Sequence, residues 1–313
     1  MTRSFNIVFM GTPAFAVPSL AALHRSRHTV IQVITQPDRP KGRGRKIVPP
    51  PVKVAARGFG LPVMQPGKVK TDSFIESLSQ LCPDVLAVAA YGHILPKTVL
   101  SIPTVGCINV HASVLPKYRG AAPIQWAIIN GERETGITTM MMDVGMDTGD
   151  ILLSATETIR PDDTAATLHD RLAVIGADVL IDTLNRLADG TLTATPQEHS
   201  QATVAPMLKK EDGRIDWNLS ADAIANRIRG MTPWPGAFAF LGDKRLKIFS
   251  AVPVTSDSAD TPGTVVAGFA DELRIATGDG ALSVLEVQGA SGKRLKVKEF
   301  LLGHPIEPGT VLG

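Results

Sequence analysis

Short apolar runs alternate with helix-forming segments in the first third of the chain, and this alternation constrains the fold more than any other feature. The run Asn6–Met10 is followed by the turn Gly11–Pro13 and then by a helical pattern around Leu20. Further strands are predicted over residues 30–35, 61–64, 84–90 and 107–110, and a helix over residues 72–80. The alternation favours an α/β fold with a doubly wound, Rossmann-like, mainly parallel sheet.

The last third of the chain has a different pattern, typical of antiparallel β structure. An amphipathic helix is predicted over residues 162–190, and the following residues, rich in Thr, Gln, Ala and Pro, are predicted to form a linker. Short alternating runs then occupy residues 238–240, 246–249, 263–266, 273–276 and 282–287. We therefore expect an α/β domain over residues 1–190, a linker over 191–207 and a small OB-like β-barrel over 208–313.

The composition limits the classes of protein to which this chain can belong. The formal charge of the 313 residues is only +2, so a nucleic-acid-binding surface has to be sought locally. Cys82 and Cys107 lie in apolar sequence and form neither a disulfide framework nor a metal-binding spacing. The longest apolar runs are far shorter than the roughly 20 residues of a membrane-spanning helix. We expect a cytoplasmic monomer with no membrane role and no metal.

The first strand is not followed by a dinucleotide-binding fingerprint. Its turn has the sequence GTPAF, which lacks the second and third glycines of GxGxxG, and no acidic residue ends the second strand. These departures disfavour a nicotinamide-dependent enzyme. Gly11 is instead interpreted as a tight turn near the edge of a ligand site.

Residues 36–51 form a segment of high positive charge with several glycines and prolines. This composition excludes a helix or a central strand. One interpretation is a solvated surface loop. The other is a loop that contacts phosphates, which its position after the second strand favours because α/β folds bind ligands at that edge of the sheet. The basic residues are Arg39, Lys41, Arg43, Arg45 and Lys46.

The segment GCINVHASVLPKYRG, residues 106–120, carries the candidate chemistry. Asn109 and His111 are two residues apart on a predicted strand, so their side chains share a face and can reach one reacting atom. Cys107 shares that face but is roughly 13 Å from His111 along a strand, too far for a Cys/His nucleophile, and we expect it in the core. Asp147, in the glycine-rich segment 142–150, is the candidate partner of His111.

The loop that follows this strand offers binding groups. Its backbone is suited to a planar heterocycle, and Lys117 or Arg119 is placed to meet an anion. A structural role for Asn109 and His111, in which they satisfy loop backbone groups, is the competing interpretation.

Several motifs together resemble the folate-dependent formyltransferase family over the whole chain. The matching segments are FMGTPAFAVPSL, TQPDRPKGRGRK, PVKVAA, VAAYGHILP, GCINVHASVLPKYRGAAPIQWAI, TGITTMMMDVGMDTGD, KKEDGRIDW, TPWPGA and TGDGALSVLEVQ. Two departures are small: HASVLPKYRG stands where the family usually has HGSLLPRYRG, and GKRLK differs from the family's later GKK element. The basic segment and the C-terminal barrel resemble the members of the family that act on methionine attached to initiator tRNA.

The resemblance implies transfer of a formyl group from 10-formyltetrahydrofolate to the α-amine of that methionine. Asn109 would donate to the developing oxyanion, His111 would either share that task as a cation or relay the proton, and Asp147 would orient His111 or hold a water. Folate would lie on the backbone of Ser113, Val114, Leu115 and Pro116. The tRNA would meet the basic segment, Arg43 above all, together with Lys209 and Lys210 and the barrel.

Two alternatives remain open from the sequence. A formyltransferase acting on a small-molecule amine would keep Asn109, His111 and Asp147 without needing the basic segment or the barrel. A noncatalytic RNA-binding protein on the same scaffold would not need these three residues.

Overall fold

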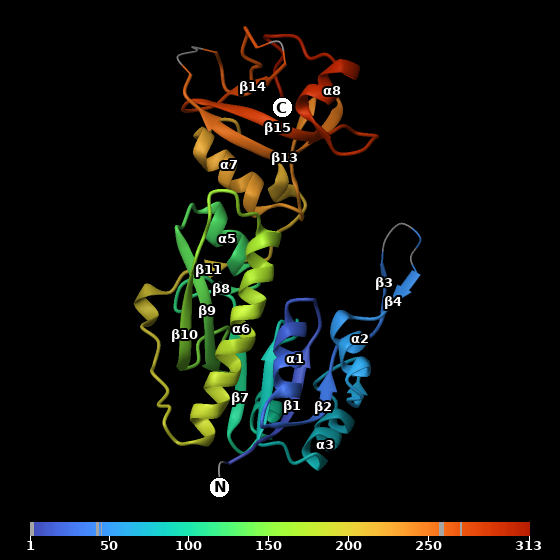
Figure 1. The fold of residues 1–313 in the computed structure, drawn as a ribbon, viewed down its shortest axis with the longest axis vertical. Coiled ribbons are helices and arrows are strands. Elements are labelled where there is room, and N and C mark those ends of the chain that lie inside the picture. Colours follow the sequence, from blue (N-terminus) through green and yellow to red (C-terminus); the bar gives the residue numbers. More distant parts are fainter. Residues whose placement is uncertain (1–2, 42–43, 45, 257–259, 270) are drawn as a thin grey trace. The chain divides into compact units, whose positions relative to one another are not determined.

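A computed structural model describes residues 3–41, 44, 46–256, 260–269 and 271–313, and its chain divides into two compact units (Figure 1). The first unit comprises Met1–Gly120, Thr135–Thr158 and His169–Ala205, and the second comprises Ala121–Glu134, Ile159–Leu168 and Pro206–Gly313. The chain therefore passes between the units several times. Within the described residues, no helix is both long enough and apolar enough to span a membrane.

A seven-stranded sheet with the order β10-β9-β7-β6-β1-β2-β5 forms the centre of the first unit. Its strands are β1 (Asn6–Gly11), β2 (Thr29–Ile34), β5 (Val63–Met64), β6 (Val85–Ala89), β7 (Gly106–His111), β9 (Glu134–Met141) and β10 (Ile151–Thr158). The pairs from β5 to β7 are parallel, whereas β7 and β9 are antiparallel. The predicted doubly wound, mainly parallel sheet is confirmed.

Helices cover both faces of this sheet. They are α1 (Ala16–Arg25), α2 (Pro51–Gly58), α3 (Asp72–Gln80), α4 (Lys97–Leu100) and α6 (Ala165–Ala188). The α6 helix begins after Thr164, whose hydroxyl accepts a hydrogen bond from the Thr167 N–H at 3.3 Å, which satisfies one free donor of the first turn. It packs closely on β7, because a Cβ added to Gly176 would lie 3.0 Å from the Val110 side chain.

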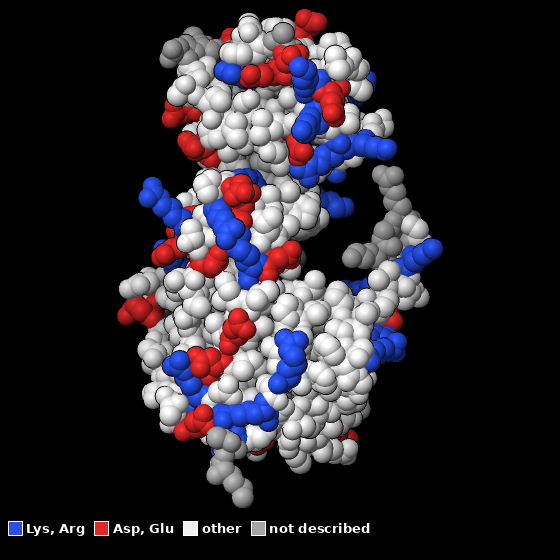
Figure 2. Space-filling model, in the orientation of Figure 1, with Lys and Arg blue, Asp and Glu red and all other residues white. Residues whose placement is uncertain are grey.

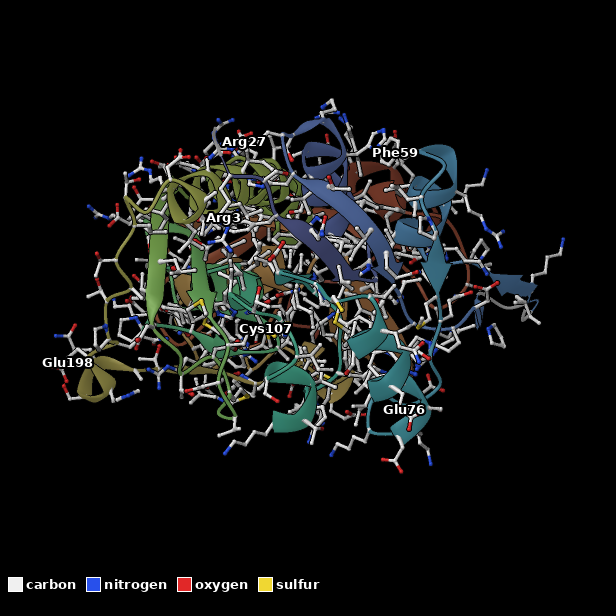
Figure 3. The ribbon with its side chains drawn as sticks, turned by 90° about the horizontal axis from the view of Figure 1, so that it is seen from below. Arg3, Arg27, Phe59, Glu76, Cys107 and Glu198 are labelled. Carbon is white, nitrogen blue, oxygen red and sulfur yellow. The ribbon has the colours of Figure 1, made fainter. Side chains whose placement is uncertain are left out.

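Cys107 lies on the face of β7 opposite to the one that packs against α6. This residue is 2% exposed and packs in a cluster with Leu86 of β6 and with Phe74 and Leu78 of α3. Figure 3 labels this residue near the middle of the view from below. Cys107 is therefore a core residue, as predicted, and burial raises its pKa to about 12, so that it stays a thiol at neutral pH. Cys82, by contrast, is exposed, so its predicted apolar environment was wrong.

Gly11 allows close packing at the start of α1. A Cβ added at this position would lie 2.7 Å from the Ala16 Cβ and 3.0 Å from the Ala89 carbonyl oxygen. The absent side chain thus lets α1 begin directly against the ends of β1 and β6. The structure assigns to close packing the glycine that the sequence suggested for a ligand edge.

The basic segment forms a short hairpin, which the sequence did not predict. Its strands β3 (Arg39–Lys41) and β4 (Lys46–Val48) pair antiparallel with Arg39 opposite Val48, and they form a sheet separate from the central one (Figure 1). Proline is tolerated there because an isolated two-stranded ribbon has free edges. We call residues 39–48 the basic hairpin.

The second unit contains an antiparallel sheet that closes into a small barrel, as predicted. Its strands are β12 (Ala237–Leu241), β13 (Lys244–Val254), β14 (Leu273–Ala276), β15 (Ala281–Gln288) and β16 (Leu295–Lys296), in the order β12-β13-β15-β14 with β16 on β15. Isolated bridges close the ring: Ile275 of β14 meets Val265, Thr264 meets Val311, and Leu312 meets Leu241 of β12. Closure removes the free sheet edges that would invite aggregation.

Helices α5 (Pro123–Ile129), α7 (Ala221–Gly230) and α8 (Val297–Gly303) complete the second unit. Ile224 and Ile228 of α7 lie four residues apart and are fully buried in one cluster with Ile248 of β13 and Val284 of β15. On the face shown in Figure 2, basic and acidic side chains are interspersed over this unit. Its charge is therefore mixed, as the sequence suggested.

Candidate active site

The end of β7 carries the two central residues of the candidate site. Asn109 and His111 project from the face opposite Val110, because alternate residues of a strand share a face. His111 is 5% exposed. Asn109 is half-buried, and its side chain forms no hydrogen bond with another residue in the described part of the chain. A polar amide with unused donors thus stands on the same face as a buried imidazole.

One nitrogen of His111 is fixed by the backbone. Its Nε2 lies 2.9 Å from the Tyr118 carbonyl oxygen, and because a carbonyl can only accept, Nε2 must carry a proton. Any proton that His111 gains or loses is therefore exchanged at Nδ1. The bond to Tyr118 also fixes the plane of the ring.

Asp147 lies on the Nδ1 side of this ring. Its Oδ2 is 3.7 Å from the His111 Nδ1 and accepts a hydrogen bond from the Gly120 N–H at 2.9 Å. The Asp147 side chain is 16% exposed, and its backbone is left-handed with φ of +54°. The structure thus brings Asp147 beside His111, a proximity that a motif alone could not establish.

The predicted folate-binding residues form a rigid turn after β7. Thr138 of β9 holds this turn, because its hydroxyl donates to the Ser113 carbonyl at 2.8 Å and accepts from the Leu115 N–H at 3.1 Å. Ser113 is fully buried and donates through its hydroxyl to the Lys117 carbonyl at 2.6 Å. Val114 and Pro116 are half-buried between them. The peptide groups of the turn are held in place before any ligand binds.

Arg119 does not provide the anion contact suggested by the sequence. It is 8% exposed, and its guanidinium donates to the Gln197 Oε1 from Nε at 3.1 Å and from Nη2 at 2.6 Å. The same Nη2 lies 3.0 Å from the His199 Nδ1, which must accept, since a guanidinium can only donate. Arg119 is therefore part of the interior hydrogen-bond network.

Sequence reasoning missed the part of this network that follows α6. The predicted linker contains η1 (His199–Gln201) and β11 (Val204–Ala205), and β11 pairs in parallel with β8 (Arg119–Gly120). Gly120 has φ of +121°, and a Cβ there would lie 2.7 Å from the Ala205 carbonyl, so only glycine allows this approach. A segment with no periodicity in a Thr-, Gln- and Pro-rich stretch gave no signal for these contacts.

The structure separates the predicted tRNA-binding residues into two groups. On the basic hairpin, Arg39 and Lys46 are exposed and Lys41 ends β3, whereas Arg43 and Arg45 lie outside the described residues. In the second unit, Lys209 and Lys210 are exposed just before η2 (Glu211–Gly213). The backbone N–H of Lys209 donates to the Asp212 carboxylate at 2.6 Å.

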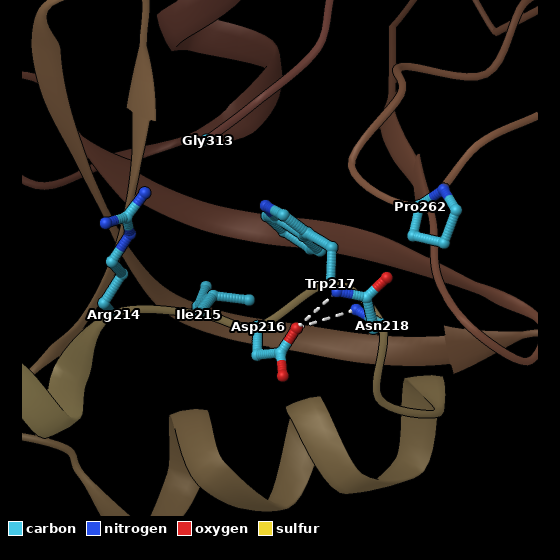
Figure 4. A pocket seen from close by; sticks show the side chains of 7 residues that line it. All are labelled: Arg214, Ile215, Asp216, Trp217, Asn218, Pro262 and Gly313. Atoms are coloured by element: carbon cyan, nitrogen blue, oxygen red, sulfur yellow. Dashed lines mark hydrogen bonds between the residues drawn. The ribbon is translucent and has the colours of Figure 1, made fainter.

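A pocket in the second unit contains none of the predicted site residues. Arg214, Asp216, Trp217 and Asn218 are among the residues that line it (Figure 4). Asp216 accepts hydrogen bonds from the backbone and side chain of Asn218, and these bonds lower the pKa of its carboxyl group. Among the residues with described positions, no cluster of three or more His, Cys, Asp or Glu side chains could hold a metal ion.

Comparison with known families gives a match in each half of the chain. Residues 5–184 match the family described as formyl transferase, and residues 207–305 match the formyl transferase C-terminal domain. A methionyl-tRNA formyltransferase of Citrifermentans bemidjiense is 52% identical over 308 residues, covering 98% of this chain and 96% of that protein. One from Desulfotalea psychrophila is 53% identical over 310 residues, covering 99% and 96%.

Solved structures show the same fold at lower sequence identity. An N-formyltransferase of Helicobacter canadensis, in complex with folinic acid and dTDP-3-aminofucose, has a TM-score of 0.68 at 19% identity and covers 89% of this chain and 98% of its own. HypX of Aquifex aeolicus, in complex with tetrahydrofolic acid, has a TM-score of 0.64 at 18% identity and covers 96% and 47%. At such identities the likeness concerns the fold alone.

Proposed function

The chain belongs to the formyl transferase family, and we propose that it transfers the formyl group of 10-formyltetrahydrofolate to the α-amine of methionine on initiator tRNA, for translation initiation. One observation carries this proposal: relatives about half identical over nearly the full chain are methionyl-tRNA formyltransferases. The match to these relatives includes the basic segment and the C-terminal barrel.

The reaction needs little help from a strong base. An α-amine has a pKa near 8, so about a tenth of it is neutral near pH 7 and able to attack. The folate, when bound, supplies the electrophilic formyl carbon. The protein has to stabilise the negative charge that develops on the formyl oxygen and to accept a proton from the nitrogen.

Asn109 and His111 are suited to these two tasks. The unused N–H groups of Asn109 can donate to the oxygen that gains charge. His111 is held by the Tyr118 carbonyl at Nε2, so the amine proton would be taken at Nδ1, where Asp147 lies 3.7 Å away. A proton at Nδ1 would then face a carboxylate, which balances the charge of the imidazolium. We assign Asp147 to orient and balance His111.

The turn of Ser113, Val114, Leu115 and Pro116 is proposed to hold the folate. Hydrogen bonds from Thr138 fix its peptide groups in advance, which lowers the entropy lost on binding. Peptide N–H and C=O groups suit the edge of a pterin ring, which alternates hydrogen-bond donors and acceptors. The chemistry of the turn therefore fits this co-substrate.

The basic residues of the hairpin and of the second unit are proposed to contact the tRNA. Arg39, Lys41, Arg43, Arg45 and Lys46 would meet its acceptor end, because protein readout of RNA favours unpaired ends over the deep groove of a duplex. Lys209, Lys210 and the barrel would contact backbone phosphates and so orient the tRNA. We further infer an α/β catalytic domain over residues 1–190, a tRNA-binding domain over 208–313 and a linker between them.

We also infer that the protein acts as a monomer in the cytoplasm, free of membranes. A single copy supplies Asn109, His111 and Asp147 from one unit, so the proposed chemistry does not require a second chain. Sedimentation at assay concentration should give one species of 33.2 kDa. A stable dimer would contradict the inference.

A direct competition tests the proposed function. Purified protein is supplied with 10-formyltetrahydrofolate and either methionyl-tRNA or small amines such as glycinamide ribonucleotide or an amino-sugar nucleotide. Formylation of methionyl-tRNA should exceed that of the small amines by orders of magnitude in kcat/KM. Preference for a small amine would overturn the proposed substrate, and tRNA binding without any turnover would indicate a noncatalytic RNA-binding protein.

A further inference from the structure

Gln197 makes four hydrogen bonds from the interior of the first unit. Its Nε2 donates to the Asp147 carbonyl at 2.9 Å and to the Gly149 carbonyl at 2.6 Å, and its Oε1 accepts two bonds from Arg119. The residue is 6% exposed, so bulk water cannot easily replace these partners. The amide group of Gln197 thus joins the Asp147 loop to β8.

The orientation of this amide is determined by its neighbours. A flipped amide would place Oε1 against two carbonyl oxygens and Nε2 against a guanidinium, so all four contacts would be repulsive. In the observed orientation, every donor faces an acceptor. Gln197 is therefore a rigid connector with one possible arrangement.

The Asp147 backbone is a part of the site that needs such a connector. A left-handed φ of +54° is unfavourable for a residue with a Cβ and persists only where its surroundings enforce it. Gln197 holds the main chain at the Asp147 carbonyl and at the Gly149 carbonyl that follows it, while the Gly120 N–H holds the carboxylate. Arg119 and Gly120 are adjacent residues of β8. This strand therefore fixes the Asp147 backbone through the bonds from Arg119 to Gln197, and it fixes the Asp147 carboxylate through the Gly120 N–H.

We propose that Gln197 is a positioning residue that sets the distance between the Asp147 carboxylate and His111 by holding the Asp147 carbonyl. The inference rests on the proposed role of Asp147 in formyl transfer. A geometric error of about 1 Å at a catalytic group can cost on the order of a hundredfold in rate, so a group that holds the backbone of Asp147 affects turnover without touching a substrate. Neither substrate binding surface involves Gln197.

The Gln197→Glu variant tests this inference. Glutamate keeps the length of the side chain and still accepts from Arg119, but it presents a carboxylate oxygen to the Asp147 and Gly149 carbonyls. We expect kcat for methionyl-tRNA formylation to fall about 30-fold, with both KM values changed less than about twofold. Gln201→Glu is the matched control, because the same change is made four residues later on an exposed side chain, and it should leave kcat unchanged.

A double-mutant cycle with Asp147→Asn separates positioning from a general structural role. If Gln197 acts through Asp147, adding Gln197→Glu to Asp147→Asn should lower kcat less than about threefold further. A full 30-fold loss in that background would show that Gln197 acts elsewhere and would overturn the inference. Gln197→Met, which is uncharged and of similar length, replaces Gln197→Glu in every comparison if the glutamate variant does not fold.

The two proposals fail in different ways. If Asp147→Asn alone retains wild-type kcat, the role of Asp147 is wrong and the inference about Gln197 falls with it. If Asp147→Asn is impaired while Gln197→Glu and Gln197→Met retain wild-type kcat, only the inference about Gln197 is overturned. A parallel rise in both KM values with unchanged kcat would likewise overturn it, because substrate binding would then be affected in place of the reacting groups.

Discussion

The candidate active site and the basic hairpin, both in the first unit, are built on opposite principles. His111 is 5% exposed, and it, Asp147 and the adjoining turn are held by hydrogen bonds to fixed backbone groups. On the hairpin, Arg39 and Lys46 are exposed and the two strands pair only with each other. Fixed hydrogen bonds are therefore concentrated where we propose that the reaction occurs, and exposed positive side chains lie where we propose that the tRNA binds.

The difference follows from what each task demands. Proton transfer depends on atomic positions within a fraction of an ångström, and the buried, hydrogen-bonded ring of His111 meets this demand. Attraction of a phosphate backbone depends on the number of cations near it and tolerates movement. Substitutions in the site should thus change kcat, and substitutions on the hairpin should change KM for tRNA.

The largest effect is expected for Asn109→Ala and His111→Ala. Each should lower kcat by about 10²-fold to 10³-fold, because one lost oxyanion donor or proton acceptor has that cost, while KM for tRNA stays near the wild-type value. Initial rates of methionyl-tRNA formylation measure both constants.

Cys107→Ala is the control for these substitutions on the same face of β7. It should lower thermal stability through a small cavity and leave kcat unchanged, since Cys107 is a core residue. If Asn109→Ala or His111→Ala retained normal turnover, that residue would be removed from the mechanism and the structural interpretation would be favoured.

A smaller effect is expected for substitutions on the basic hairpin. The double variant Arg39→Ala/Lys46→Ala should raise KM for methionyl-tRNA about tenfold with little change in kcat, because two cations that attract phosphates are lost. The slope of log KM against log salt should fall by about 0.7 for each single-strand phosphate contact removed.

Lys97→Ala provides the matched control, since Lys97 is exposed on α4 and has no proposed contact with tRNA. It should leave both KM and its salt dependence as in the wild type. An equal fall in kcat with Arg43→Ala and with the double variant, at unchanged KM, would instead show that the hairpin supports the reacting groups.

The two regions also differ in how far the sequence predicted them. Strand periodicity placed Asn109 and His111 on one face of β7 and assigned Cys107 to the core, because a period of two is a local property of the chain. The barrel strands were likewise visible as short alternating runs, and the match to residues 273–276 is complete. Such features depend only on near neighbours.

Features that depend on distant contacts were not predictable. The bonds of Gln197 to Arg119 and Asp147 join residues 78 and 50 positions apart, and nothing in a Thr-, Gln- and Pro-rich stretch announces them. Arg119 was predicted to meet an anion because a charged side chain is expected at the surface. Its hydrogen-bond partners lie in a segment that was predicted to be a linker. The hairpin strands escaped prediction because they have only each other as partners.

A weaker effect on KM for tRNA is expected for a substitution of Asp38, which directly precedes the hairpin. Both carboxylate oxygens of Asp38 accept from the Lys53 ammonium at 2.7 Å, and Gln65 donates to one of them at 2.8 Å. The hydrogen bond from Lys53, and then that from Gln65, lowers the pKa of Asp38, so the bridge is complete above the ordinary value of 3.8 and is lost only as pH falls through the lowered value. Asp38→Asn should raise KM for tRNA about threefold at neutral pH, since the hairpin loses part of its anchor.

Asp182→Asn is the control for a surface ion pair without a role in the hairpin, because Asp182 pairs with Arg186 on α6 at 2.8 Å. It should leave KM for tRNA unchanged. If Asp38→Asn behaved in the same way, the orientation of the hairpin would not depend on Asp38, and the contrast with the rigid active site would become sharper.

The smallest effect concerns the pH dependence of stability at the amino end of β2, whose carboxyl end leads into the hairpin. His28 is buried, stacks on the Phe5 ring and accepts a hydrogen bond from the Phe5 N–H at 3.2 Å. Burial, followed by the charge of Arg27, lowers its pKa below 6.5, although Asn185 and Asp189 act in the opposite direction. The unfolded chain thus binds more protons below pH 6.5, so this contribution is fully present above that pH and is lost as pH falls through the lowered value.

His28→Asn should remove this dependence. The asparagine oxygen can accept from the same backbone N–H but does not titrate, so the free energy of unfolding in urea should change less between pH 7.5 and 5 than it does in the wild type. His24→Asn is the control, because His24 also stacks on an aromatic ring, that of Phe59 at 4.7 Å, but is exposed. The two histidines share the stacked geometry and differ in their access to solvent. If both variants changed the pH dependence of the free energy of unfolding equally, burial of His28 would not be the cause of that dependence.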